Sequence, residues 1–274
     1  MTLALLSGPA FAHAAPAALP ALPLAAAAPA ADWTKLMAER SPALVTVKFV
    51  LKFEPASQEQ ETEITAVIID PSGLLLCSNT QTGGLPPLIQ RQLGGMTATP
   101  TDIKVLIGED TEGISAKLIA RDRELDLAWI KIDDTGGKQL TAVDFSKSAT
   151  PNVGDTLLTI GRLGKFFDRA PVVQMTRLGG TTKKPRKLYI PADESIAREI
   201  GKPVFAEDGA VIGFTALQLP EADDVEGGDM NSSDYLSAVI LPAEDVVKAT
   251  ARALETAATD QGAATETPAE PAPK

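Results

Sequence analysis

Histidine is almost absent from this sequence. The chain of 274 residues contains one histidine, His13, and one cysteine, Cys77. A single cysteine excludes a disulfide within the chain, and this shortage of imidazole and thiolate ligands argues against a zinc or copper site. Histidine is also the commonest general base in enzymes, because its pKa lies near neutral pH. We therefore expect no metal and no other cofactor.

Basic and aromatic residues are also scarce. Lys and Arg number 25 against 36 Asp and Glu, which gives a formal net charge of −11. Nucleic-acid binding needs a clustered basic face, so we expect no nucleic-acid partner. Aromatic residues make up only 4% of the chain, which leaves Val, Ile and Leu to fill the core. Branched side chains of this kind favour β-structure.

Charge is missing altogether from residues 1–31. An apolar stretch over 2–12 precedes the small-x-small sequence Ala12-His13-Ala14, which predicts a signal peptide over residues 1–14 and an Ala/Pro linker over 15–31. A disordered Ala/Pro arm is the alternative, whereas the repeated prolines argue against a transmembrane helix. Signal cleavage would remove His13 and implies a secreted or periplasmic protein without an integral membrane segment.

Short apolar stretches separated by turn residues occupy most of the remaining chain. Their composition and partial alternation predict strands at Leu44–Leu51, Glu63–Asp70, Leu74–Cys77, Ile103–Ile107, Ile114–Arg121, Leu127–Ile132, Thr156–Ile160, Val172–Arg177, Lys187–Ile190, Val204–Ala206, Ala210–Ala216 and Tyr235–Ile240. We expect helices at Trp33–Arg40 and Pro242–Leu254, a linker around 133–148, and a long loop over 83–101 with a helical turn near 88–93. The Ala/Thr/Pro/Glu-rich tail over 256–274 should be disordered.

Three stretches carry recognisable motifs. Residues 65–80 read TAVIIDPSGLLLCSNT, residues 120–132 contain Asp126-Leu127-Ala128, and residues 198–203 read REIGKP before a turn and a strand. In this order they resemble the HtrA/Deg branch of trypsin-like serine proteases over roughly residues 40–255. The resemblance implies an all-β fold of two six-stranded antiparallel β-barrels, the trypsin-like double barrel, with a C-terminal helix.

The same resemblance implies boundaries within that fold. The double-barrel domain would span residues 32–255, with the first barrel at about 41–133, the second at about 149–241 and the terminal helix at 242–255. Val153-Gly154-Asp155 and Ala238-Val239-Ile240-Leu241-Pro242 match the opening and the close of the second barrel.

The catalytic triad of the family is degenerate in this alignment. Thr80 falls where the family has its histidine, Ile200 where it has its serine, and Asp126 on its aspartate. A threonine hydroxyl is no base near neutral pH, and Ile200 has no nucleophilic atom. We interpret Asp126 as a structural residue that hydrogen-bonds buried backbone or Thr80 between the barrels. The alternative interpretation is a catalytic remnant.

Three other groups have a functional and a simpler interpretation. Ser195 and Lys202 resemble a Ser–Lys dyad, but we expect a solvated lysine in so charged a loop. Residues 221–234 carry enough acids for a calcium loop, but their spacing favours a solvated loop. The basic run at 183–187 could dock an anionic partner or envelope surface, but we favour a solvated hairpin tip.

The sequence thus predicts a secreted or periplasmic pseudoprotease that acts as a binding or scaffold module. An extended peptide or protein segment could pair with strand edges in the cleft between the barrels, because backbone pairing needs no triad. The alternatives are a serine-type endopeptidase with a noncanonical site and a purely structural envelope protein.

Overall fold

The computed structural model describes residues 32–193, 199–219 and 237–265. The predicted signal peptide (1–14) and linker (15–31), Ser195, the acidic segment (221–234) and the last part of the tail (266–274) lie outside the described residues. The same ranges bound every statement below about what the structure contains.

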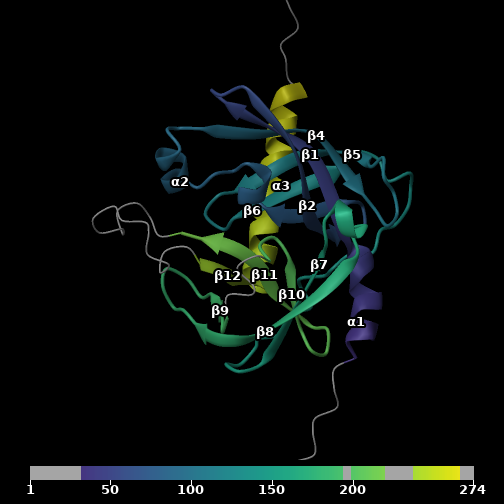
Figure 1. Ribbon diagram of the computed structural model, residues 1–274, viewed down its shortest axis with the longest axis vertical. Helices are drawn as coiled ribbons and strands as arrows, with labels where there is room; N and C mark the ends of the chain where they lie inside the picture. Colours follow the sequence, from purple (N-terminus) through teal and green to yellow (C-terminus); the bar gives the residue numbers. More distant parts are fainter. Residues whose placement is uncertain (1–31, 194–198, 220–236, 266–274) are drawn as a thin grey trace, which may run out of the picture. The chain divides into compact units, whose positions relative to one another are not determined.

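The first barrel is closed by six antiparallel strands in the order β1-β2-β3-β6-β5-β4 (Figure 1). Its strands are β1 (Leu44–Glu54), β2 (Gln58–Asp70), β3 (Leu74–Ser78), β4 (Thr97–Leu106), β5 (Ile114–Asp122) and β6 (Leu127–Ile132). The residues of β1 and β2 next to the turn that joins them are mostly exposed and polar. The far ends of the two strands are mostly buried. The barrel interior is filled by aliphatic side chains and Phe49, as the shortage of aromatic residues requires.

The second barrel repeats this architecture in the order β10-β11-β12-β9-β8-β7. Its strands are β7 (Thr156–Arg162), β8 (Pro171–Thr181), β9 (Tyr189–Pro191), β10 (Pro203–Ala206), β11 (Val211–Gln218) and β12 (Ser237–Pro242). Two closed six-stranded antiparallel barrels followed by a C-terminal helix confirm the predicted fold class.

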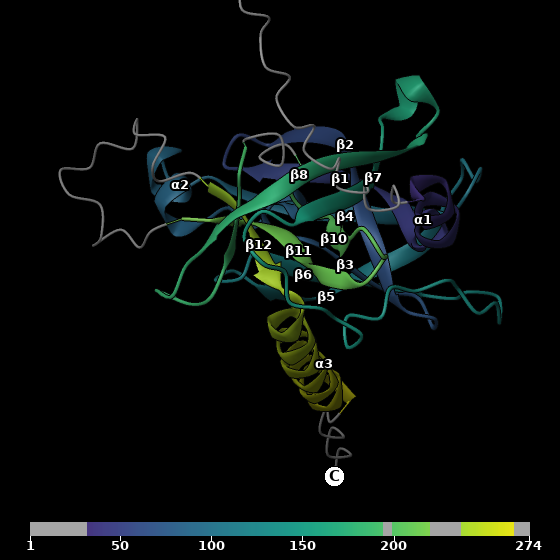
Figure 2. The same ribbon diagram turned by 90° about the horizontal axis from the view of Figure 1, so that it is seen from below.

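Helices lie outside the barrels. These are α1 (Trp33–Arg40), α2 (Pro87–Gln92) and α3 (Ala243–Thr265), with single 3₁₀ turns η1 (Ser41–Ala43), η2 (Thr80–Thr82) and η3 (Lys165–Phe167). Asp32 caps α1 by accepting the Lys35 N–H at 3.1 Å. Helix α3 contacts β5 of the first barrel as well as β11 and β12 of the second (Figure 2). The Trp129 indole fixes it by donating to the Thr250 hydroxyl at 3.1 Å.

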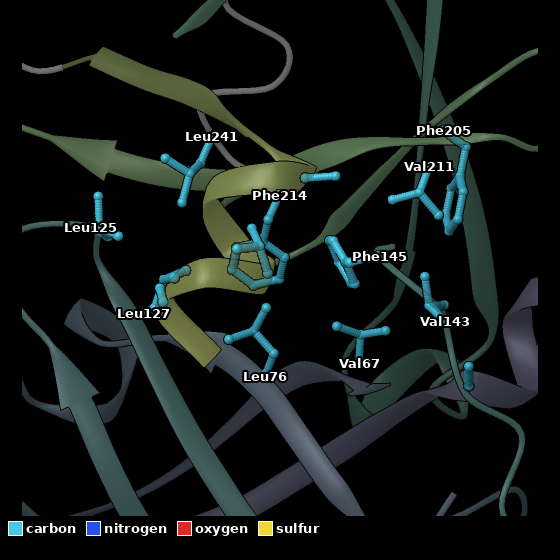
Figure 3. Close-up of a cluster of buried hydrophobic side chains, with 14 of the residues drawn as sticks. Val67, Leu76, Leu125, Leu127, Val143, Phe145, Phe205, Val211, Phe214 and Leu241 are labelled. Atoms are coloured by element: carbon cyan, nitrogen blue, oxygen red, sulfur yellow. The ribbon is translucent and has the colours of Figure 1, made fainter. Parts of the chain in front are cut away.

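An apolar cluster joins the two barrels. Figure 3 shows Val67, Leu76 and Leu127 of the first barrel facing Phe214 and Leu241 of the second. The segment that connects the barrels takes part, because its Val143 and Phe145 are buried in the same cluster. The rings of Phe145 and Phe214 meet edge to face, with centroids 6.4 Å apart. The connecting segment is therefore a component of the core between the barrels.

Several element boundaries differ from the sequence prediction; β2, for example, begins at Gln58 rather than Glu63, and β8 ends at Thr181 rather than Arg177. Strand β4 begins at Thr97, so the end of the expected 83–101 loop is strand that pairs with the long β1. Helix α3 continues to Thr265, past the predicted end at Leu254 and through the first part of the tail predicted to be disordered. The buried Ala253 and Ala257 continue the apolar face of α3. No helix in the described ranges is long and apolar enough to cross a membrane.

Candidate functional site

Asp126 is a buried carboxylate at the junction of the two barrels. It stands just before β6, and only 2% of its surface is exposed. Its Oδ1 accepts the Thr80 N–H at 2.7 Å, and its Oδ2 accepts the Ser78 hydroxyl at 2.9 Å. Oδ2 also accepts the N–H of Leu217, on β11 of the second barrel, at 2.9 Å. One side chain thus hydrogen-bonds to both barrels.

Burial and hydrogen bonding have opposite effects on the Asp126 carboxyl. Removal from water raises its pKa, because burial penalises the ionised form. The hydrogen bonds from Leu217, Thr80 and Ser78 lower the pKa, but burial is the larger effect and the pKa lies above its ordinary value. These contacts agree with the structural interpretation of Asp126 given above.

Arg121 of β5 also holds the turn that carries Thr80. The Arg121 guanidinium donates to the Asn79 Oδ1 at 2.7 Å and to the Thr82 carbonyl at 2.7 Å. Burial lowers the pKa of Arg121. The Asn79 N–H in turn donates to the Asp126 carbonyl at 3.0 Å. Arg121, Ser78 and the Leu217 amide were not identified from the sequence, because these contacts arise only when β3, β5 and β11 come together.

The loop that carries Ile200 closely approaches the Thr80 turn. Ile200 is half-buried and precedes Gly201, whose φ is +81°. A Cβ on Gly201 would lie 2.6 Å from the Gln81 Oε1 and 3.2 Å from the Ser78 nitrogen, so only glycine fits. Thr80 and Asp126 are therefore in direct contact. Ile200 is next in sequence to Gly201, which closely approaches the turn that carries Thr80.

Lys202 corrects one expectation. The charged sequence of this loop predicts a solvated lysine, but the Lys202 and Glu199 side chains are only 12% and 6% exposed and form an ion pair. The Gln174 amide donates to the other Glu199 oxygen at 2.7 Å. In this pair the ammonium is a hydrogen-bond donor rather than a base. Several charged residues close together in sequence usually indicate a solvated surface loop. Here the opposite charges of Glu199 and Lys202 compensate each other while both side chains are mostly buried.

A glycine on the neighbouring strand makes room for Lys202. A Cβ on Gly161 of β7 would lie 2.6 Å from both the Nζ and the Cε of Lys202. The lysine stem therefore occupies space over β7 that any larger residue at position 161 would fill.

The basic run lies at a hairpin tip, between β8 and β9. Lys183 and Lys184 are exposed there. Arg186 forms an ion pair with Glu124 of the first barrel, and the Lys187 ammonium lies 5.3 Å from the centroid of the Tyr189 ring. No group of His, Cys, Asp and Glu side chains suited to a metal ion occurs in the described part of the chain. The acidic segment considered as a calcium loop is not part of it.

Comparison with known proteins identifies a family. The model of the trypsin-like peptidase domain matches residues 65–214. A probable periplasmic serine endoprotease, DegP-like, of Rhizobium meliloti is 30% identical over 126 residues, which cover 44% of this chain and 24% of that protein. The serine endoprotease DegS of Salmonella typhimurium is 28% identical over 122 residues, covering 43% and 33%. This chain therefore matches less than half the length of either relative.

Solved structures share the fold. Deg5 superimposes with a TM-score of 0.53 at 17% identity and covers 78% of this chain and 90% of its own. An HtrA-type protease solved with a decapeptide gives 0.53 at 18% identity, covering 81% and 67%. The same type of protease with a tripeptide gives 0.51 at 18% identity, covering 79% and 61%.

Proposed function

This chain belongs to the trypsin-like peptidase family, and from that premise we propose that it is a catalytically inactive, HtrA-like pseudoprotease. It acts outside the cytoplasm, in the periplasm or after secretion, as a module that binds extended peptide or protein segments. The proposal separates the fold, which the family shares, from hydrolysis, which depends on particular residues.

The hydrogen bonds of Asp126 carry this proposal. In a triad the aspartate accepts a hydrogen bond from the imidazole N–H and so orients the base. Here the carboxylate accepts from Ser78, Thr80 and Leu217, which are a hydroxyl and two backbone amides. The chain has one histidine, at position 13, far in sequence from the aligned motifs. Asp126 therefore serves to join the barrels, and the described residues around it include no histidine.

The opposite side of the site supports the same conclusion. Ile200, aligned with the nucleophile, offers only carbon atoms for attack. Two residues further on, Lys202 is engaged by Glu199 and is unsuited to activate a serine as a free amine would. A noncanonical Ser–Lys endopeptidase is thus the weaker hypothesis.

Peptide binding is supported by the family rather than by the triad positions. HtrA-type proteases of the same fold have been solved with a tripeptide and with a decapeptide. Extended peptides bind such folds through backbone hydrogen bonds, which do not need a nucleophile or a base. The relatives named periplasmic or Deg-like support a location in the envelope.

An active-serine probe tests the loss of catalysis. The full chain is treated with a fluorophosphonate, with the Ser195→Ala variant as control and an active Deg-type protease as positive standard. We expect no label on either form of this chain and no cleavage of unfolded casein. Labelling that disappears in Ser195→Ala would reject the pseudoprotease and establish the noncanonical enzyme.

A photo-crosslinking peptide library tests the binding function. Crosslinks mapped by mass spectrometry should fall on residues 78–82 and 199–203, which line the junction of the barrels. A library that crosslinks nowhere on the chain would contradict the binding function and favour a purely structural envelope protein.

A further inference from the structure

Strands β4 and β5 close the first barrel through a very short contact. They pair only at Lys104 with Ser115 and at Val105 with Ile114. Beyond these pairs, residues 97–101 of β4 pair with β1, and residues 116–122 of β5 pair with β6. Over these lengths, the edges of β4 and β5 that face each other have no strand partner among the described residues.

A cavity of about 790 Å³ fills the gap between these two edges. Its walls include residues 97–103 of β4 and Ala116, Lys117 and Leu118 of β5, and residues 83–85 and Met96 close one end. Thr80, Asp126 and Ile200 are not among the residues that line it. This β4–β5 gap is therefore a site distinct from Thr80, Asp126 and Ile200, and it adjoins them through Arg121, which lines the gap and also holds the Thr80 turn.

Unpaired strand edges favour one kind of ligand. The backbone N–H and C=O groups that β4 and β5 direct into the gap can pair with an added strand. Residues 97–103 span about 20 Å at roughly 3.3 Å per residue, enough for a short extended peptide. Pro100 has no N–H and so supplies no donor to an added strand. Leu85, Ile103 and Leu118 provide an apolar wall for alternate side chains.

The charge of the gap contrasts with that of the chain. Lys117, Arg121 and Arg123 line it against the single acid Asp102, whereas the whole chain carries −11. Arg123 has no ion pair within the described residues, whereas the Lys117 side chain, 76% exposed, forms an ion pair with Asp133 at 3.1 Å. A cationic rim on an acidic protein selects a negatively charged ligand.

We propose that the β4–β5 gap binds an extended acidic segment of a partner protein by β-strand addition. The partner's backbone pairs with β4, β5 or both. Its apolar side chains alternate into the wall, and its carboxylates face Lys117 and Arg123. This site is distinct from the peptide site proposed at the barrel junction.

The test uses the full chain and a labelled decapeptide with Glu at every second position and Val between. The matched control peptides replace Glu by Lys, or carry N-methyl groups on alternate backbone nitrogens. We expect only the unmodified acidic peptide to bind by fluorescence polarisation, with slowed hydrogen exchange of amides in 97–103 and 116–122. Arg123→Glu should weaken binding about five- to tenfold, since it reverses a charge at the rim. Lys147→Glu, which reverses the charge of another exposed cation outside the gap, should not.

The outcomes separate this site from the function proposed above. Protection restricted to 78–82 and 199–203 would assign the peptide to the barrel junction and overturn the β4–β5 site while leaving the proposed function standing. No binding of the acidic peptide, or equal binding of the N-methylated one, would also overturn strand addition. Thermal unfolding of Arg123→Glu at the wild-type temperature confirms that a loss of binding is not a loss of fold.

Discussion

Two buried carboxylates stand on either side of the barrel junction, and they are compensated in different ways. Asp126 is 2% and Glu199 is 5% exposed. Asp126 receives neutral donors, two of them backbone amides, and one of those belongs to the other barrel. Glu199 receives the ammonium of Lys202, three residues away, and the amide of Gln174.

The difference shows two ways of stabilising a carboxylate that is buried away from water. Backbone amides are fixed by the strands and turns that carry them, so the Asp126 site depends on both barrels being assembled. The Glu199–Lys202 pair is local to one loop, and its attraction offsets the desolvation of two ions only while both are present. The first site should therefore be sensitive to hydrogen-bond geometry and the second to charge balance.

The largest effect should come from breaking the ion pair. Lys202→Met leaves the Glu199 carboxylate buried without a cation and should lower the free energy of unfolding by about 3–5 kcal/mol. The double variant Glu199→Leu/Lys202→Met removes both charges and should be within about 1–2 kcal/mol of wild type or more stable. Urea unfolding followed by circular dichroism measures both. A single variant as stable as the double would show that the pair is not buried in solution.

A smaller loss is expected at the barrel junction. Asp126→Asn keeps the shape of the side chain but places an amide NH₂ against at least one of its N–H or O–H donors. One unsatisfied buried donor should lower the free energy of unfolding by about 1–3 kcal/mol. Asp133→Asn, which disrupts an exposed pair with Lys117, is the matched control and should change it by less than about 1 kcal/mol. Equal effects of the two variants would contradict the hydrogen-bonded role of Asp126.

The smallest effect concerns pH. The pKa of Asp126 is raised in the folded protein, chiefly by burial. Its contribution to stability is therefore full below the ordinary aspartate pKa and is lost as the pH rises through the raised value. The stability difference between wild type and Asp126→Asn should shrink from acidic to neutral pH, as measured by urea unfolding at several pH values. A difference that grows with pH would mean that the hydrogen bonds outweigh burial.

Local pattern predicted most elements of the fold. Helix Trp33–Arg40 and strand Leu127–Ile132 were predicted with the bounds observed, because cap residues and strand composition act over a few residues. The errors lie where the boundary of an element depends on contacts with residues that are distant in the sequence. Strand β4 begins early because β1 offers it a long edge, and α3 runs on where its alanines continue an apolar face.

By itself the sequence determined that this chain has almost no histidine, that its core is mostly aliphatic and that its motifs follow the order of the trypsin-like family. Tertiary structure alone decided which donors Asp126 accepts from, that Lys202 is mostly buried against Glu199, and that β4 and β5 diverge. The physical reason is the same in each case. Hydrogen bonds, ion pairs and strand edges depend on which backbone lies opposite, and spacing along the chain does not encode that directly.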